Sequence, residues 1–286
     1  MKLFLLTFLN GLTLAALYFL VASGFTLVFG LMRNVNLAHG SLYLLGAYVG
    51  FSAMQWTGSW VFGVAAGFVS MAALGVVLQL AIFRHMEGQD MRQTMVTIGL
   101  SIVLADVMLW IWSGNTYQFE APEALTGATP LPLVKVYSVY RLFVLGVAIV
   151  IGVGLWLFLN RTRIGMMIRA GVDDRGMLSA TGVNVHLVFA VTFAIGAGLA
   201  GFAGVVGGTA LSIAPGEDVR YLLASLVVTI VGGMGSITGA AIGALLIGMA
   251  EQFGLAYSPT YGIVYTFLIM VLVLAFRPQG IMGKRH

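Results

Sequence analysis

Residues 222–253 read LLASLVVTIVGGMGSITGAAIGALLIGMAEQF, an apolar run whose one charged residue is Glu251. About 20 apolar residues in a helix span the hydrocarbon core of a bilayer, so this run exceeds one crossing. Gly232, Gly233 and Gly235 interrupt it, and the part before them reaches only about 15 Å. We therefore expect a glycine-broken segment, either a re-entrant hairpin or two short tilted helices that meet at the glycines. A broken backbone at membrane depth must be buried in protein or line a wet cavity, so these glycines are candidates for a solute path.

Further apolar runs fill most of the remaining chain. They cover residues 4–31, 38–54, 60–83, 94–113, 142–160, 187–211 and 261–276. Hydrophobic residues make up 60% of the sequence, charged residues 8%, and the mean hydropathy is +1.01, whereas a soluble domain carries about 25% charged residues. The alternating strands of a membrane barrel are absent from the sequence. The predicted fold is an all-α integral membrane protein, one domain of residues 1–286 with about eight transmembrane segments.

The distribution of basic residues predicts the orientation, because cytoplasmic loops are enriched in Lys and Arg. Three segments qualify as cytoplasmic, and their basic residues are Arg84, His85 and Arg92; Arg161, Arg163, Arg169 and Arg175; and Arg277, Lys284 and Arg285. The links 114–140 and 212–221 are then outside, and the C-terminus is cytoplasmic. Residues 222–253 must start and end outside. The N-terminus is also outside if residues 33–38 form a cytoplasmic turn; a membrane-embedded break at residues 34–39 is the alternative.

Composition excludes several other classes of protein. The sequence has no cysteine, which removes disulfides and thiolate chemistry. Its net charge of +4 comes from scattered basic residues without a nucleic-acid-binding module. The phosphate-binding pattern Gly-x-x-x-x-Gly-Lys-Ser/Thr is also absent from the sequence. We therefore expect no nucleic-acid partner, and no ATP, metal or other cofactor bound by this chain.

The longest cytoplasmic link, residues 160–184, has mixed charge and an apolar set at Met177, Leu178 and Ala180. This pattern predicts a short amphipathic helix that lies against another surface. A solvated loop is the alternative.

Five stretches in the same order resemble the permease subunits of ABC-type importers for branched-chain and other hydrophobic amino acids. The resemblance covers nearly the whole chain. The stretches are GFTLVFG at 24–30 with NLAHGS at 36–41 and GAY at 46–48; TIGLS at 97–101; the 160–184 link at Gly165, Arg169, Ala170, Met177, Ser179, Gly182 and Asn184; VGGMGS at 231–236 with Gly239; and FRPQG at 276–280.

This resemblance implies a set of partners in a bacterial inner membrane. A second, homologous permease would complete the pore, two cytoplasmic ATPase subunits would use ATP-Mg, and a periplasmic binding protein would deliver the solute. The 160–184 link would be the element that docks on an ATPase. Its expected coupling residues are Arg169, Ala170, Met177, Ser179 and Gly182.

Polar residues inside the apolar runs or next to them are candidates for the translocation path. Besides the three glycines they are Asn36, His39, Ser41, Thr97, Ser101 and Asp106. Asp106 lies within an apolar run, where a charge costs at least about 2.5–3.5 kcal/mol, so an intramembrane carboxylate indicates a functional role or a structural hydrogen bond. His39 fits either a solute contact or a packing role.

The sequence therefore predicts a permease subunit of an ATP-driven importer that moves branched-chain or related amino acids by alternating access. Two alternatives remain. A proton- or ion-coupled secondary transporter would use Asp106 as a relay and the broken segment as a discontinuous helix. An intramembrane enzyme would use His39 or Asp106 as a base, but no nucleophile or metal-ligand spacing accompanies either residue.

Overall fold

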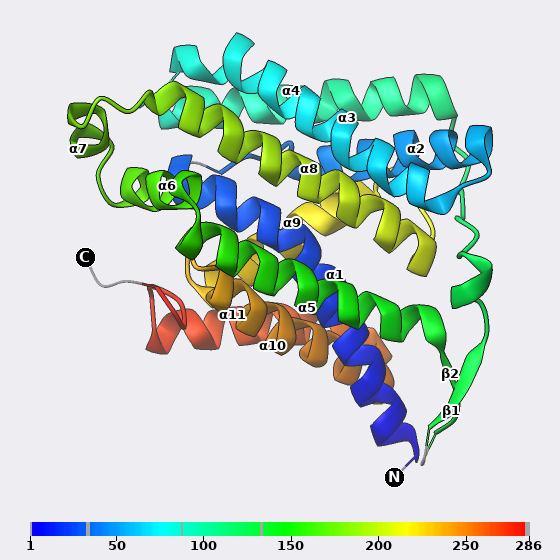
Figure 1. Ribbon diagram of the computed structural model, residues 1–286. Helices are drawn as coiled ribbons and strands as arrows, with labels where there is room; N and C mark the ends of the chain where they lie inside the picture. Colours follow the sequence, from blue (N-terminus) through cyan, green and yellow to red (C-terminus); the bar gives the residue numbers. More distant parts are fainter. Residues whose placement is uncertain (1, 33–34, 87, 132–133, 284–286) are drawn as a thin grey trace.

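The computed structural model describes residues 2–32, 35–86, 88–131 and 134–283, and it shows a bundle of long helices (Figure 1). The helices are α1 (Lys2–Met32), α2 (His39–Thr57), α3 (Trp60–Ala81), α4 (Asp90–Trp112), α5 (Val139–Arg161), α6 (Arg163–Asp173), α7 (Arg175–Ala180), α8 (Val185–Leu211), α9 (Glu217–Gly232), α10 (Ile237–Tyr257) and α11 (Gly262–Phe276). Short 3₁₀ turns lie at Phe83–Met86, Glu123–Leu125 and Pro259–Tyr261. The all-α membrane fold is confirmed.

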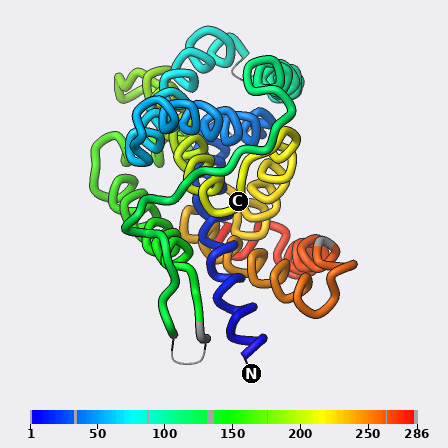
Figure 2. Tube along the Cα trace, turned by 90° about the vertical axis from the view of Figure 1, so that its right-hand side faces the viewer, coloured from blue at the N-terminus to red at the C-terminus, as the bar shows by residue number. Residues whose placement is uncertain are grey.

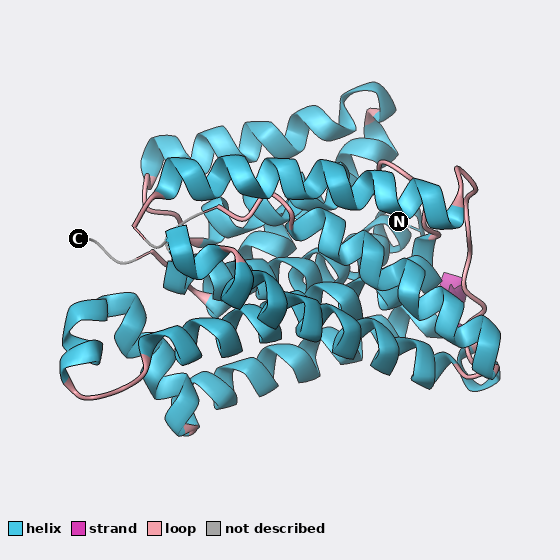
Figure 3. Cartoon of the chain, turned by 90° about the horizontal axis from the view of Figure 1, so that it is seen from above, coloured by secondary structure: helices cyan, strands magenta, loops and turns pink. Residues whose placement is uncertain are grey.

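Six of the described helices are long and apolar enough to cross a membrane by length and composition: α1, α3, α4, α5, α8 and α10. The helices run side by side between two ends, where the loops gather (Figure 3). One end holds α6, α7 and the described end of the chain, and the other holds the N-terminus and two short strands (Figure 1). We call the first the basic end, because the arginines of α6 lie there.

The two strands belong to a link that the sequence analysis did not resolve. β1 (Ala128–Leu131) and β2 (Val134–Ser138) pair antiparallel. Figure 2 looks at this end and shows the link crossing it before the hairpin projects beside the N-terminus. A single bridge between Tyr117 and Ile213 fastens the link to the segment after α8.

The glycine-broken run is two helices, as one of the sequence hypotheses states, but their lengths differ from the expectation. α9 has 16 residues rather than about ten, because it begins at Glu217 after Gly216, whose φ is +90°. Glu217 and Asp218 in its first turn favour this start, since negative charge stabilises a helix N-terminus. α10 has 21 residues and reaches about 32 Å, enough to cross the hydrocarbon core alone.

Two helices, α1 and α8, form the centre of the bundle, and the most apolar stretch of 18 residues is 94% buried in α1 and 78% buried in α8. Glycines let the backbones of these helices approach each other and α2. A Cβ at Gly24 would collide with the carbonyl oxygen of Gly196, and one at Gly204 with the carbonyl oxygen of Tyr43 on α2. Close approach at small residues is the usual way that helices associate in lipid.

Candidate translocation and coupling sites

The link between α1 and α2 brings polar residues deep into the bundle. His39, the first residue of α2, is buried, and its Nε2 lies 3.1 Å from the carbonyl oxygen of Val21. Val21 is about 16 Å along α1 from the end of that helix. α2 therefore starts well inside the bundle. This supports the embedded break over its described part, residues 35–38; Arg33 and Asn34 lie outside the described residues.

Ser41 connects three helices at this point. Its Oγ lies 3.1 Å from Oδ2 of Asp218 in the first turn of α9, and 3.4 Å from the carbonyl oxygen of Ser101 on α4. Gly40 makes the approach possible, because a Cβ there would overlap the carbonyl oxygen of Asp218. Asp218 is 8% exposed. A buried carboxylate thus faces the start of α2.

The preceding residues extend the same contact to α4. The backbone N–H of Leu37 donates to Oγ1 of Thr97 at 3.2 Å, and the Oδ1 of Asn36 accepts from the backbone N–H of Ala38. We call the group the polar seam; its members are Asn36, His39, Ser41, Thr97, Ser101 and Asp218. Five of these six are sequence candidates, and the structure brings them together.

One buried polar atom at the seam, Nδ2 of Asn36, lacks a hydrogen-bond partner among the described residues. The hydroxyl of Tyr43, by contrast, interacts with that of Tyr221, and the two rings pack with centroids 4.1 Å apart. Buried polar groups almost always bind protein or water. The Asn36 amide is therefore available to water or to a polar solute.

His39 has contacts that suit packing. Its ring meets Phe25 edge-on, with centroids 5.3 Å apart, while Nε2 reaches the α1 carbonyl described above. Both contacts hold α2 against α1. His39 therefore holds the start of α2 in place and does not present a free imidazole.

A second charged cluster lies beside the first turn of α9. The Tyr18 hydroxyl donates to Oε2 of Glu251 at 2.6 Å, and Arg220 lies 3.5 Å from Oε1 of the same carboxylate. Arg220 also lies 3.6 Å from Glu217, and half of its side chain is exposed. The sequence analysis missed this cluster, because it assigned residues 217–220 to an outside loop. Glu251, the lone charge of a long apolar run, was the available signal.

Asp106 lies apart from the seam. It is nine residues from Thr97, which places it on the opposite side of α4, and it is exposed. α4 packs mainly against α2. Its outer face therefore carries a carboxylate far from the other candidates.

The three glycines of the broken run lie at the basic end of the bundle, whereas the sequence predicted a break at membrane depth. The backbone N–H groups of Ile281 and Met282 donate to the carbonyls of Val231 and Gly232 at 2.9 Å. Gly235 touches Gly30 near the end of α1. α10 is long enough to cross the bundle, which places the break at one end of it, and residues 281–282 then cover the break.

The 160–184 link forms two helices rather than one. α6 and α7 meet at Asp174, whose side chain caps α7 by accepting from the N–H groups of Gly176 and Met177. Leu178 is buried and contacts the position of Gly171, which also faces Leu31 of α1. All five predicted coupling residues are exposed, and Met177 is 68% exposed. α7 is thus anchored by one apolar side chain and presents another.

Within the described part of the chain, no group of three or more His, Asp or Glu side chains could hold a metal ion. The geometry instead defines a membrane bundle with a polar seam and a helical elbow at its basic end. This is the class of a transport permease.

The comparisons identify the family. Residues 7–275 match the family described as the branched-chain amino acid transport system permease component, so the chain belongs to it and is a permease component of an ABC importer. It is 31% identical to the high-affinity branched-chain amino acid transport system permease protein BraD of Pseudomonas aeruginosa, covering 96% of this chain and 94% of BraD. It is 32% identical to LivH of Escherichia coli K12, with coverage of 98% and 96%. The structure of PsaBC from Streptococcus pneumoniae in complex with Fab shares the fold, with a TM-score of 0.53, 12% identity, and coverage of 94% and 91%.

Proposed function

We propose that this permease moves branched-chain amino acids inward across a bacterial inner membrane, and that the solute passes the polar seam. The relatives BraD and LivH are named as branched-chain amino acid permeases over nearly the full length of this chain. The observation that carries the proposal is the junction of Ser41, Ser101 and Asp218. It gathers polar groups from three helices at a depth where lipid could not satisfy them.

The seam suits a zwitterion with an apolar side chain. The Asp218 carboxylate matches an ammonium group, and the unpartnered Nδ2 of Asn36 can donate to a carboxylate or to water. Binding must differ between the two states of the transporter, because a ligand shifts an equilibrium only by its differential affinity.

A second permease would cover the outer face of α4. Asp106 is exposed there, and a carboxylate facing lipid costs at least about 2.5–3.5 kcal/mol. Covering this face with a partner removes the cost. Two ATPase subunits would supply energy with ATP-Mg, and a periplasmic protein would deliver the solute.

The elbow of α6 and α7 would dock on an ATPase. Its exposed Met177 and Ser179 form the contact, and Leu178 transmits displacement to the end of α1 through Gly171 and Leu31. The described end of the chain lies at the same end of the bundle (Figure 1), so the proposal makes the C-terminus cytoplasmic, in agreement with the basic residues.

Uptake into vesicles tests this function. The assembled complex should accumulate labelled leucine only with ATP and the binding protein, and an Asp218→Asn variant should lower uptake at least fivefold at equal assembly. Glu123→Gln changes an exposed carboxylate in the far link and should leave uptake unchanged. Accumulation driven by a proton gradient without ATP would instead support the secondary transporter.

A further inference from the structure

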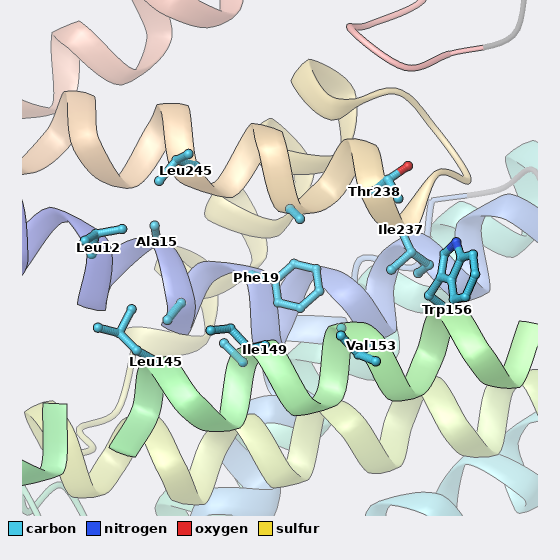
Figure 4. Close-up of a pocket in the computed structure, with 14 residues that line it drawn as sticks. Leu12, Ala15, Phe19, Leu145, Ile149, Val153, Trp156, Ile237, Thr238 and Leu245 are labelled. Carbon is cyan, nitrogen blue, oxygen red and sulfur yellow. The ribbon is translucent and has the colours of Figure 1, made fainter. Parts of the chain in front are cut away.

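An open apolar groove runs along the outside of the bundle between α1, α5 and α10. It has a volume of about 490 Å³. Among its lining residues, two side chains carry a polar group, the hydroxyl of Thr238 and the indole N–H of Trp156 (Figure 4). Small residues form part of its lining, namely Ala15, Ala16, Ala148 and Gly152, and the Phe19 ring lies beside Gly152. On α5 the lining extends from Leu145 to Trp156, about 16 Å along the helix.

The groove ends beside a cationic side chain. On α5 the lining positions Ile149, Val153 and Trp156 follow one helical stripe, and Asn160 continues it one turn further. The Asn160 amide donates to the carbonyl of Trp156 at 2.7 Å and accepts from Nη1 of Arg169 at 2.8 Å. Asn160 therefore holds the exposed Arg169 guanidinium about one helical turn beyond the residues of α5 that line the groove.

We propose that the groove binds an anionic phospholipid, with one acyl chain along α5 and the headgroup on Arg169 and Asn160. An apolar groove has no polar partners for water, whereas a lipid chain fills it and removes apolar surface from solvent. Guanidinium groups bind phosphate through fixed paired donors. The basic end is predicted to be cytoplasmic, where basic pockets between membrane helices attract anionic headgroups.

The charge beside the groove favours a lipid as its occupant. The groove is open along one side, so a lipid chain can lie in it with its headgroup at the membrane surface. Arg169 then matches the phosphate of that headgroup. An apolar helix of the partner permease would offer this guanidinium no anion, and the crosslinking test below separates the two occupants.

The site can be tested in vesicles of equal phosphatidylglycerol and phosphatidylcholine that contain a photoreactive diazirine analogue of either lipid. The full-length protein, with its partners if they copurify, should crosslink the phosphatidylglycerol analogue at least fivefold more than the phosphatidylcholine analogue, on peptides of α5 and α10. Ala241→Phe fills an exposed wall of the groove and should reduce crosslinking of both analogues at least fivefold.

Two further variants separate the headgroup from the chain. Arg169→Gln should abolish the preference for phosphatidylglycerol while the remaining crosslinks stay in the groove. Ile242→Phe, on the neighbouring exposed position of α10 that does not line the groove, should change neither. Equal crosslinking of the two analogues by the unaltered protein, or unchanged crosslinking in Ala241→Phe, would overturn the proposal. A protein adduct from a photoreactive residue at position 241, in place of lipid, would overturn it in favour of a subunit interface.

Discussion

Tyr18 of α1 and Glu251 of α10, 233 positions apart in the sequence, share a hydrogen bond of 2.6 Å inside the bundle. Both residues are buried. The bond fixes the register of two antiparallel helices. Among the described residues Glu251 has one further partner, the half-exposed Arg220. The carboxylate is held at this depth by a hydroxyl and a guanidinium together.

Tyr18→Phe should lower the thermal stability of the purified protein, because it removes a hydrogen bond to a charged group. Such bonds contribute about 1.5–3 kcal/mol. In a double-mutant cycle with Glu251→Gln, the stability losses of the two single variants should add up to more than the loss of the double variant, since both substitutions act on one bond. Unfolding followed by intrinsic fluorescence in detergent measures this. Strict additivity of the two changes would show that the bond contributes nothing.

Gly233→Val should lower the yield of folded protein rather than block transport alone. Gly233 has φ +106°, and a Cβ there would collide with the backbone of Gly283. A left-handed conformation costs an L-residue about 1–2 kcal/mol even without the collision. Gly99→Ala is the control, because a Cβ at that helical position meets nothing within 4 Å. Size-exclusion yield compares them; wild-type yield with lost uptake would return the glycine to the translocation path.

The proposed docking of α7 on an ATPase predicts that Met177→Asp weakens this contact. The side chain is 68% exposed on α7 and offers apolar surface. A carboxylate at this position would lose its hydration in an interface, which is unfavourable. Copurification of the ATPase should fall at least fivefold, while the permease itself keeps its stability. Thr181→Asp, an exposed polar position one turn further, is the matched comparison. Equal retention of the ATPase by both variants would move the docking site elsewhere.

The orientation of the bundle can be read with introduced cysteines, since the sequence contains none. Ser258→Cys lies after α10 at the end that holds the N-terminus, and Ser179→Cys lies on α7 at the basic end. A membrane-impermeant maleimide should label the first in intact cells and the second only after permeabilisation. The reverse pattern would invert the predicted topology.

Hydropathy predicted the apolar segments and the break after Val231, because each depends only on local composition. Depth could not be predicted in the same way. Asp218 looks like a loop residue until α9 is packed against Gly40, and Asn36 looks like a turn residue until α2 is seen to start beside Thr97. Asp106 was found by its charge, but the direction it faces depends on how α4 packs on α2. The β1–β2 hairpin was missed because its link carries no clear strand alternation.

The most direct test of the polar seam is a cysteine at Ser101, which is partly exposed on α4 and 3.4 Å, through its carbonyl, from Ser41. Ser70→Cys, partly exposed on α3, is the comparison. A small thiol reagent should block leucine uptake in Ser101→Cys but not in Ser70→Cys, and saturating leucine should slow the modification of position 101 severalfold. Uptake that survives full modification of Ser101→Cys, or modification that leucine does not slow, would contradict a solute path through the seam.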